Sequence, residues 1–217
     1  PAPPAAAVVF LHGLGDTPAG WRSLAPQLGP RLEEVVGGRV KWLFPAAPTS
    51  KVSISGGALQ TSWFDIFDWP IGVSARDDRD GLLASTSKLH EIVAGLEAEG
   101  VPADKIVIGG FSQGGAISLL ACHRYEKTLA GCVCLSGWLT LKEEWAGARV
   151  KDNLTPIFWG HGTEDPVVLP EQVAAGSEVF KNQGPDINLD TRMYPMGHSS
   201  HPSEMSDMYD FLASALG

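Results

Sequence analysis

The residue with the clearest chemical potential is Ser112, at the centre of the segment IVIGGFSQGGAISLL. It follows a short apolar run typical of a buried strand and precedes a helical stretch, with Gly110 and Gly114 two residues to either side. Such a strand–serine–helix turn is a nucleophile elbow, in which small residues let strand and helix approach closely. A glycine-rich turn with a capping serine would give the same letters. Ser112 therefore needs partners elsewhere in the chain before it can be taken as a nucleophile.

A serine hydroxyl needs a base within hydrogen-bond reach, and that base needs a third group to hold it. His198 and His201 follow the last apolar strand, in the segment YPMGHSSHP. We choose His198 as the base because it comes directly after Gly197, near the strand end. His201 precedes a proline and the last helix, so we expect a loop or capping residue there. His12 and His161, each followed by glycine, are predicted to be structural.

Two carboxylates are candidates for the third group, Glu164 and Asp165 in the segment FWGHGTEDPVV. We prefer Asp165, because the order serine, aspartate, histidine along the chain is the one that such elbow sites use. Pro166 also stiffens the turn that presents this carboxylate. Glu164 remains the alternative acid. Asp165 could instead only cap a turn, since Asp-Pro pairs are common turn formers.

Backbone amides near the first strand could stabilise negative charge. The segment VVFLHGLGDT places Gly13, Leu14 and Gly15 after that strand, where the glycines free the N–H groups to point inward. Acyl transfer puts charge on the former carbonyl oxygen, and two prepositioned amides are worth on the order of 2 to 4 kcal/mol each there. We predict that the amides of Leu14 and Gln113 form this oxyanion hole.

The elements that must position these residues alternate along the chain between short apolar runs and helical stretches. Because the runs are continuously apolar, they predict a mainly parallel sheet with helices on both faces, and active sites in such sheets lie beyond the carboxyl ends of the strands. One helix is expected to be capped by Asp80. The expected strands are 7–11, 40–44, 106–108, 132–135, 157–159 and 189–194, and the expected helices are 21–32, 82–96, 113–125, 170–182 and 203–216.

One segment, 49–79, breaks this alternation and has no clean period apart from the run SWFDIF. We expect it to be a lid-like loop over the site. No repeat, linker or low-complexity tract divides the chain, so residues 1–217 are predicted to form one α/β domain.

Composition excludes several classes of function. With 25 acidic and 16 basic residues the net charge is −9, which repels phosphate backbones, so nucleic acid is not an expected partner. The 3 cysteines lack the spacing of a zinc site, and we predict buried, reduced thiols, no metal and a cytoplasmic protein. No stretch is apolar enough for a membrane helix, and the first residues, PAPPAAA, show no cleavable signal.

The motifs FLHGLGDT, SWFDI, GGFSQGGA, LSGWL, HGTEDPVV and MGHSS, in this order, resemble the acyl-protein thioesterase and lysophospholipase-like carboxylesterase family. The resemblance covers nearly the whole chain, and the conjunction is far more specific than any one motif. It implies a minimal α/β-hydrolase fold without a cap domain. It also implies that Ser112, Asp165 and His198 form a triad, with Leu14 and Gln113 as oxyanion donors, and that no cofactor is needed for hydrolysis of thioesters or esters.

The substrates implied are acylated proteins, including palmitoylated ones, or small acyl esters. A general carboxylesterase for short-chain esters and a non-catalytic receptor that uses a hydrolase pocket remain alternatives. Pro18, where the family usually has glycine, and the segment WPIGVSARDDRDG depart from the family pattern and bear on acyl-chain preference. Trp69 and Ile71 could make transient membrane contact. The candidate acyl-binding residues are Leu59, Ile66, Phe67, Trp69, Ile71, Trp138 and Val167.

Overall fold

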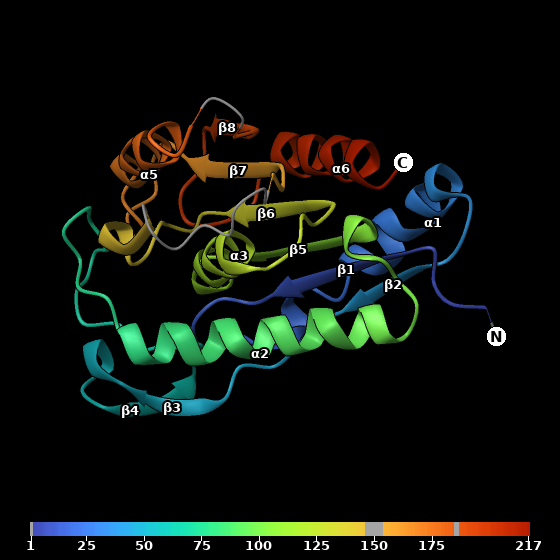
Figure 1. Cartoon of the computed structure of the whole chain (residues 1–217). Helices are drawn as coiled ribbons and strands as arrows, with labels where there is room; N and C mark the ends of the chain where they lie inside the picture. The colour runs from blue at the N-terminus through green and yellow to red at the C-terminus, as the bar shows by residue number, and fades with distance from the viewer. Residues whose placement is uncertain (1, 146–153, 185–186) are drawn as a thin grey trace.

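The computed structural model describes residues 2–145, 154–184 and 187–217. Its centre is a sheet of 6 strands in the order β2-β1-β5-β6-β7-β8, and every neighbouring pair runs parallel (Figure 1). The predicted parallel sheet is therefore confirmed. The strands are β1 (Ala6–Leu11), β2 (Val40–Leu43), β5 (Ile106–Phe111), β6 (Gly131–Leu135), β7 (Ile157–Gly162) and β8 (Leu189–Tyr194).

Two of these strands continue three residues beyond their predicted ends. β5 continues through its glycines to Phe111, and β7 continues to Gly162. A glycine directly follows each predicted strand end, but the strand continues through it, and the glycine lets a neighbour come close. A Cβ on Gly109 would lie 2.8 Å from the Cβ of Val133 on the next strand. Strand interiors use glycine where another chain segment approaches closely.

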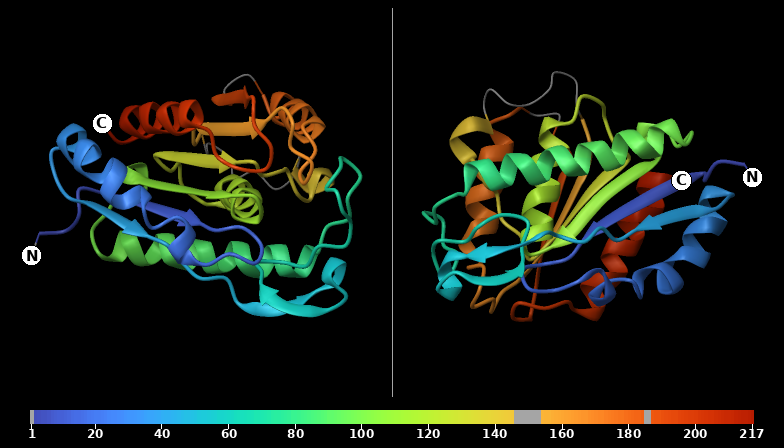
Figure 2. Two further views of the ribbon diagram at one scale, coloured as in Figure 1. Left: turned by 180° about the vertical axis from the view of Figure 1, so that it is seen from behind. Right: turned by 90° about the horizontal axis from the view of Figure 1, so that it is seen from below.

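Helices cover both faces of the sheet, as predicted. The views in Figure 2 place α2 and α3 on one face and α1 and α6 on the other. Strand β1 shows why both faces are covered: Ala7 and Val9 pack into one apolar cluster while Val8 and Phe10 pack into the other. The helices are α1 (Leu24–Val36), α2 (Arg79–Ala98), α3 (Gln113–Arg124), α5 (Glu171–Lys181) and α6 (Pro202–Leu216).

Two helix starts were predicted incorrectly. The first helix begins at Leu24 instead of residue 21, because Thr17 caps a separate 3₁₀ turn over Pro18–Gly20 that delays it. Helix α2 is capped by Asp78 rather than Asp80, since the Asp78 carboxylate accepts the Gly81 amide at 3.1 Å. Either aspartate fits the capping pattern, so spacing alone could not choose between them.

The segment 49–79 is more regular than predicted. It contains an antiparallel hairpin of β3 (Thr49–Val52) and β4 (Ala58–Thr61), which lies beside α2 in Figure 1. Gly56 and Gly57, with φ of 64° and 81°, form its turn. Strands of 4 residues are too short to show a period in the sequence. The described residues contain no separate cap domain.

The turn at Ser112 is a tight junction between a strand and a helix. Ser112 has φ 55° and ψ −120°, outside the regions that non-glycine residues prefer. A Cβ on Gly110 would lie 2.4 Å from the carbonyl carbon of Gly114, and a Cβ on Gly114 would lie 2.3 Å from the carbonyl oxygen of Leu11. The ends of β1 and β5 and the start of α3 therefore meet backbone to backbone.

Gly114→Ala should disrupt this junction, because the new methyl group would meet backbone atoms that cannot rotate away. We expect a loss of at least about 2 kcal/mol in the free energy of unfolding, measured by denaturant titration. Gly95→Ala is the matched control. Gly95 is an exposed residue within α2 with no atom near its would-be Cβ, so the same change should stabilise the protein by about 0.5 to 1 kcal/mol. Equal effects of the two substitutions would contradict the close approach.

A carboxyl group is buried where α6 begins. Glu204 is 0% exposed and lies against β7, where a Cβ on Gly160 would be 2.4 Å from its Oε1 atom. Burial raises the pKa of Glu204 to about 7, and the backbone amide of nearby His201 opposes this effect. Because the folded state holds the proton to a higher pH than the unfolded state, Glu204 makes the fold less stable as the pH rises from about 4.5 to about 7.

Glu204→Gln should remove this pH dependence. The variant should gain stability over the wild type by up to about 3 kcal/mol at pH 8, and the gain should shrink toward pH 4.5. Thermal unfolding across this pH range measures the effect. Glu171→Gln, at an exposed position in the first turn of α5, serves as the control and should change stability equally at all pH values. A gain for Glu204→Gln that did not vary with pH would contradict the assignment.

Candidate active site

The candidate site lies at the carboxyl ends of β1 and β5. The chain passes from β1 to β2 on one side and then returns to build β5 through β8 on the other, so the direction of strand order reverses between β1 and β5. Ligand sites of open parallel sheets form at such a reversal, since the two following loops diverge there. Here the loop after β1 carries Leu14 and the turn after β5 carries Ser112.

The structure brings the predicted serine, histidine and aspartate together. The Nε2 atom of His198 lies 3.0 Å from Ser112 Oγ, and its Nδ1 atom lies 2.7 Å from Asp165 Oδ2. The three residues follow β5, β7 and β8, so 86 residues separate Ser112 from His198 in the chain. This is the arrangement that a serine–histidine–aspartate proton relay requires.

Asp165 is held as a charged acceptor. Burial alone would raise the pKa of its carboxyl, but the hydrogen bond with His198 and the amides of Val167 and Val168 outweigh burial and lower the pKa. These two amides reach Asp165 Oδ1 at 2.9 and 3.0 Å. Glu164, the alternative acid, is exposed and makes no hydrogen bond or ion pair with His198 in the described part of the chain, so the geometry favours Asp165.

The other histidines have separate roles. His12 is buried and its Nε2 accepts the amide of Ala47 at 3.1 Å, which fits the predicted structural role. His201 caps α6 by accepting the Ser203 amide, as expected. His161 is closer to the relay than the sequence suggested, because its Nε2 lies 3.6 Å from Asp165 Oδ2 and 2.9 Å from the carbonyl of Val168. Burial lowers the pKa of His161, so it stays neutral at neutral pH.

Leu14 and Gln113 line the same cavity as Ser112. Neither of their backbone amides donates a hydrogen bond to another group in the described part of the chain, which leaves both available to an oxygen in the cavity. Gln113 is the first residue of α3, where backbone N–H groups have no partner inside the helix. The predicted oxyanion position is therefore consistent with the structure.

The last residue of β4 and the segment that follows it support both oxyanion donors, a feature that the sequence did not reveal. Gln113 is 1% exposed, and its side chain donates to the Phe64 carbonyl at 2.7 Å and accepts the Trp63 amide at 3.1 Å. The Gly15 amide donates to the Thr61 carbonyl at 2.8 Å. Trp63 also donates through its indole to the carbonyl of His12. In the sequence, only the run TSWF around Trp63 drew attention to this region, and its residue types did not indicate that it supports the oxyanion hole.

The cavity at Ser112 is mostly apolar and has a volume of about 180 Å³. Most predicted acyl-binding residues line it, but Leu59 does not: its side chain is 68% exposed on β4, on a short strand facing solvent. Phe67 also does not contribute to its lining. Ile71 is 3% exposed while Trp69 is 54% exposed, so of the pair predicted for membrane contact only Trp69 is accessible. The lining residues are Gly13, Leu14, Asp16, Ile66, Trp69, Ile71, Phe111, Ser112, Gln113, Trp138, Val167 and His198.

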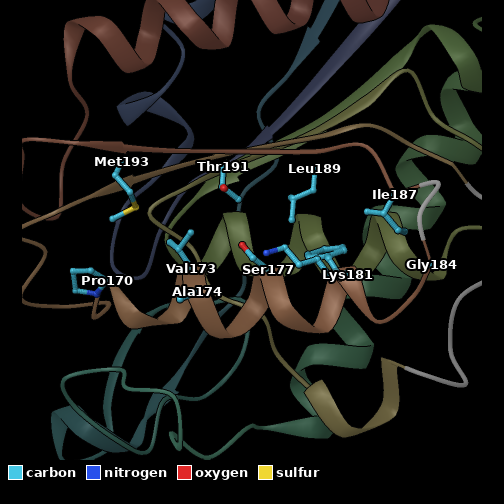
Figure 3. Close-up of a pocket in the computed structure, with 11 residues that line it drawn as sticks. Pro170, Val173, Ala174, Ser177, Lys181, Gly184, Ile187, Leu189, Thr191 and Met193 are labelled. Atoms are coloured by element: carbon cyan, nitrogen blue, oxygen red, sulfur yellow. The ribbon is translucent and has the colours of Figure 1, made fainter.

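A larger hollow of about 620 Å³ lies elsewhere, between α5 and the edge strand β8. Figure 3 shows Val173, Ser177 and Lys181 of the helix facing Leu189 and Met193 of the strand. None of the three relay residues lines this hollow. By volume alone this hollow would be chosen as the active site. The hydrogen-bonded polar side chains that catalysis requires, however, lie at the Ser112 cavity.

The chain belongs to the phospholipase/carboxylesterase family, whose model matches residues 1–216. It is 38% identical to acyl-protein thioesterase 1 of Cryptococcus neoformans, over 97% of this chain and 92% of that protein. The crystal structure of Arabidopsis thaliana SOBER1 superposes with a TM-score of 0.90 at 31% identity, covering 98% of this chain and 99% of that one. Acyl-protein thioesterase 2 of Zea mays gives 0.80 at 30% identity, covering 98% and 94%. No helix in the described residues has the length and apolar character needed to cross a membrane.

Replacing each of the two adjacent carboxylates tests which one orients the histidine. Asp165→Ala should lower kcat for ester hydrolysis by about 10³- to 10⁴-fold, because the imidazole would lose both its orientation and the charge that stabilises its protonated form. Glu164→Ala should leave kcat within about threefold, since an exposed carboxylate contributes little. The opposite ranking in steady-state assays would assign the acid to Glu164.

Proposed function

We propose that this protein is a serine hydrolase that removes acyl groups from proteins, an acyl-protein thioesterase. The observation that carries the proposal is the relay itself: Ser112 Oγ, His198 and Asp165 are joined by contacts of 3.0 and 2.7 Å at the wall of an apolar cavity. Family membership and the similarity to acyl-protein thioesterase 1 of Cryptococcus neoformans support it. An acyl chain suits the apolar lining, and the acylated protein would remain outside.

In the first step, Ser112 Oγ attacks the carbonyl carbon of the thioester while His198 Nε2 takes the hydroxyl proton. Asp165 holds the imidazole in the tautomer that leaves Nε2 free and stabilises the imidazolium that forms. The carbonyl oxygen becomes negatively charged and accepts hydrogen bonds from the amides of Leu14 and Gln113. The acyl carbon is then bonded to both Ser112 and the thiol sulfur.

The intermediate collapses when the carbon–sulfur bond breaks and His198 gives its proton to the departing sulfur. The product is a free cysteine thiol on the protein and an acyl ester on Ser112. A water molecule then enters, loses a proton to His198 and attacks the same carbon. Release of the carboxylic acid returns the proton to Ser112 Oγ and restores the site.

Two other readings of the site make different predictions. A carboxylesterase for small esters would use the same relay, and the small cavity volume of about 180 Å³ favours it for short acyl groups. A receptor without catalysis would bind a small molecule and turn nothing over. The aligned Ser112, His198 and Asp165 argue against a receptor, because binding alone does not require a hydrogen-bonded relay.

We also propose that the protein acts in the cytoplasm, on acylated proteins. Trp69 is the residue that is exposed for contact with a membrane.

Ser112→Ala should abolish covalent labelling by a fluorophosphonate and reduce p-nitrophenyl ester turnover by about 10⁴-fold or more, because the nucleophile is lost. Ser177→Ala is the control, since Ser177 lines the larger hollow between α5 and β8. It should keep both activities. Retained labelling and turnover in Ser112→Ala would end the proposal, and their loss in Ser177→Ala would move the site to the other hollow.

A further inference from the structure

A strap of backbone, residues 69–73, closes one side of the Ser112 cavity. Its Ile71 pairs with the loop that carries Asp165: the Ile71 amide donates to the Val167 carbonyl at 2.8 Å, and the Leu169 amide donates to the Ile71 carbonyl at 3.1 Å. Ile71 is 3% exposed, and both Ile71 and Val167 line the cavity. The strap therefore forms part of the cavity wall and rests on the acid loop.

Two polar side chains hold the strap just beyond Ile71. Gln172, in the first turn of α5, is 1% exposed and donates from its side-chain amide to the Gly72 carbonyl at 2.7 Å. Lys142 donates to the Val73 carbonyl at 2.7 Å and to Gln172 Oε1 at 3.3 Å. Burial of a glutamine is unfavourable unless its polar atoms are bonded, and both ends of this side chain are bonded here. We call Gln172 and Lys142 the strap clamp.

The wall that Ile71 forms separates the cavity from further open space. Ile66, Ile71 and Trp138 line both the Ser112 cavity and a hollow of about 10 Å³ behind it. That hollow shares Ala75 and Asp77 with an open hollow of about 430 Å³, which Lys142 also lines. A row of hollows therefore runs from the serine, behind the strap, to the surface.

Of the three wall residues, Ile71 is the one that the clamp controls. Trp138 packs edge-on against Phe64 with ring centroids 5.7 Å apart, and the carbonyl of Ile66 accepts the Ile54 amide. Ile71 instead lies on the strap, directly before the two carbonyls that Gln172 and Lys142 bind. Displacement of the strap would move this side chain and join the hollows.

We propose that Gln172 is a positioning residue that sets the acyl length the site accepts, by clamping the strap so that Ile71 closes the end of the cavity. The inference rests on the proposed function, because it concerns the acyl group that Ser112 attacks. Gln172 touches neither the relay residues nor the cavity. It acts through Gly72 and Ile71, and its loss should change which substrates fit while leaving the chemistry in place.

Gln172→Met tests the proposal, because it keeps the length of the side chain and removes both hydrogen bonds. With acyl thioesters from acetyl to palmitoyl, the ratio of kcat/KM for long chains to that for acetyl should rise about fivefold, the worth of one net hydrogen bond. The acetyl substrate itself should change by less than about twofold, since it does not reach the wall. Gln27→Met, the same change at an exposed position on α1, should leave the whole profile unaltered.

Two further variants identify the route of the effect. Lys142→Met removes the other half of the clamp, should shift the profile in the same direction, and carries the test if Gln172→Met does not fold. Ile71→Ala opens the wall directly, so adding Gln172→Met to it should produce no further shift. An equal loss of activity at every chain length, or a full additional shift in the Ile71→Ala background, would overturn the proposal. Failure of the wild type to hydrolyse any thioester would instead overturn the proposed function.

Discussion

The close contact between the ends of β1 and β5 and the start of α3 is the constraint on which the site depends. Neither Gly110 nor Gly114 has room for a Cβ, so backbone meets backbone at this junction. The contact forces Ser112 into a backbone conformation at φ 55° that costs on the order of 1 to 3 kcal/mol. The surrounding parallel sheet, buried on both faces, supplies the packing that maintains it. The strain raises the hydroxyl above the sheet and places the first amide of α3 beside it.

Much of this could be predicted from the sequence. The glycines around Ser112, the order of serine, acid and histidine, and the apolar runs all reflect local requirements that a short segment records. The grouping of Ser112, Asp165 and His198 followed from the rule that parallel strands end at one edge of the sheet. The predicted parallel sheet and its helices on both faces are confirmed, and the catalytic roles of the three residues stay a proposal.

What could not be predicted depends on distant contacts. The hairpin within 49–79 has short strands whose pairing leaves no period, and Leu59 was assigned to the cavity because nothing in its neighbours shows that it faces solvent. The bonds from Gln113 to Trp63 and Phe64 join segments 49 and 50 residues apart. The bond from Gln172 to Gly72 spans 100 residues. The sequence around a glutamine does not indicate which distant backbone group its side chain will bind, so these hydrogen bonds are visible only in the folded structure.

The segment 49–79 therefore has two attachments with different consequences. At its Thr61 to Phe64 end it is bonded to the loop after β1 and to Gln113, the two elements that hold the oxyanion amides. At its Ile71 end it is bonded to the loop of Asp165. That loop uses the amides of Val167 and Val168 to keep the carboxylate charged, and the carbonyl of Val167 to hold the strap. The peptide group between Val167 and Val168 donates its N–H to Asp165 and offers its carbonyl to the strap. Because these are separate atoms, the strap can move away without removing a donor from Asp165. The chemistry and the choice of acyl group can then vary separately.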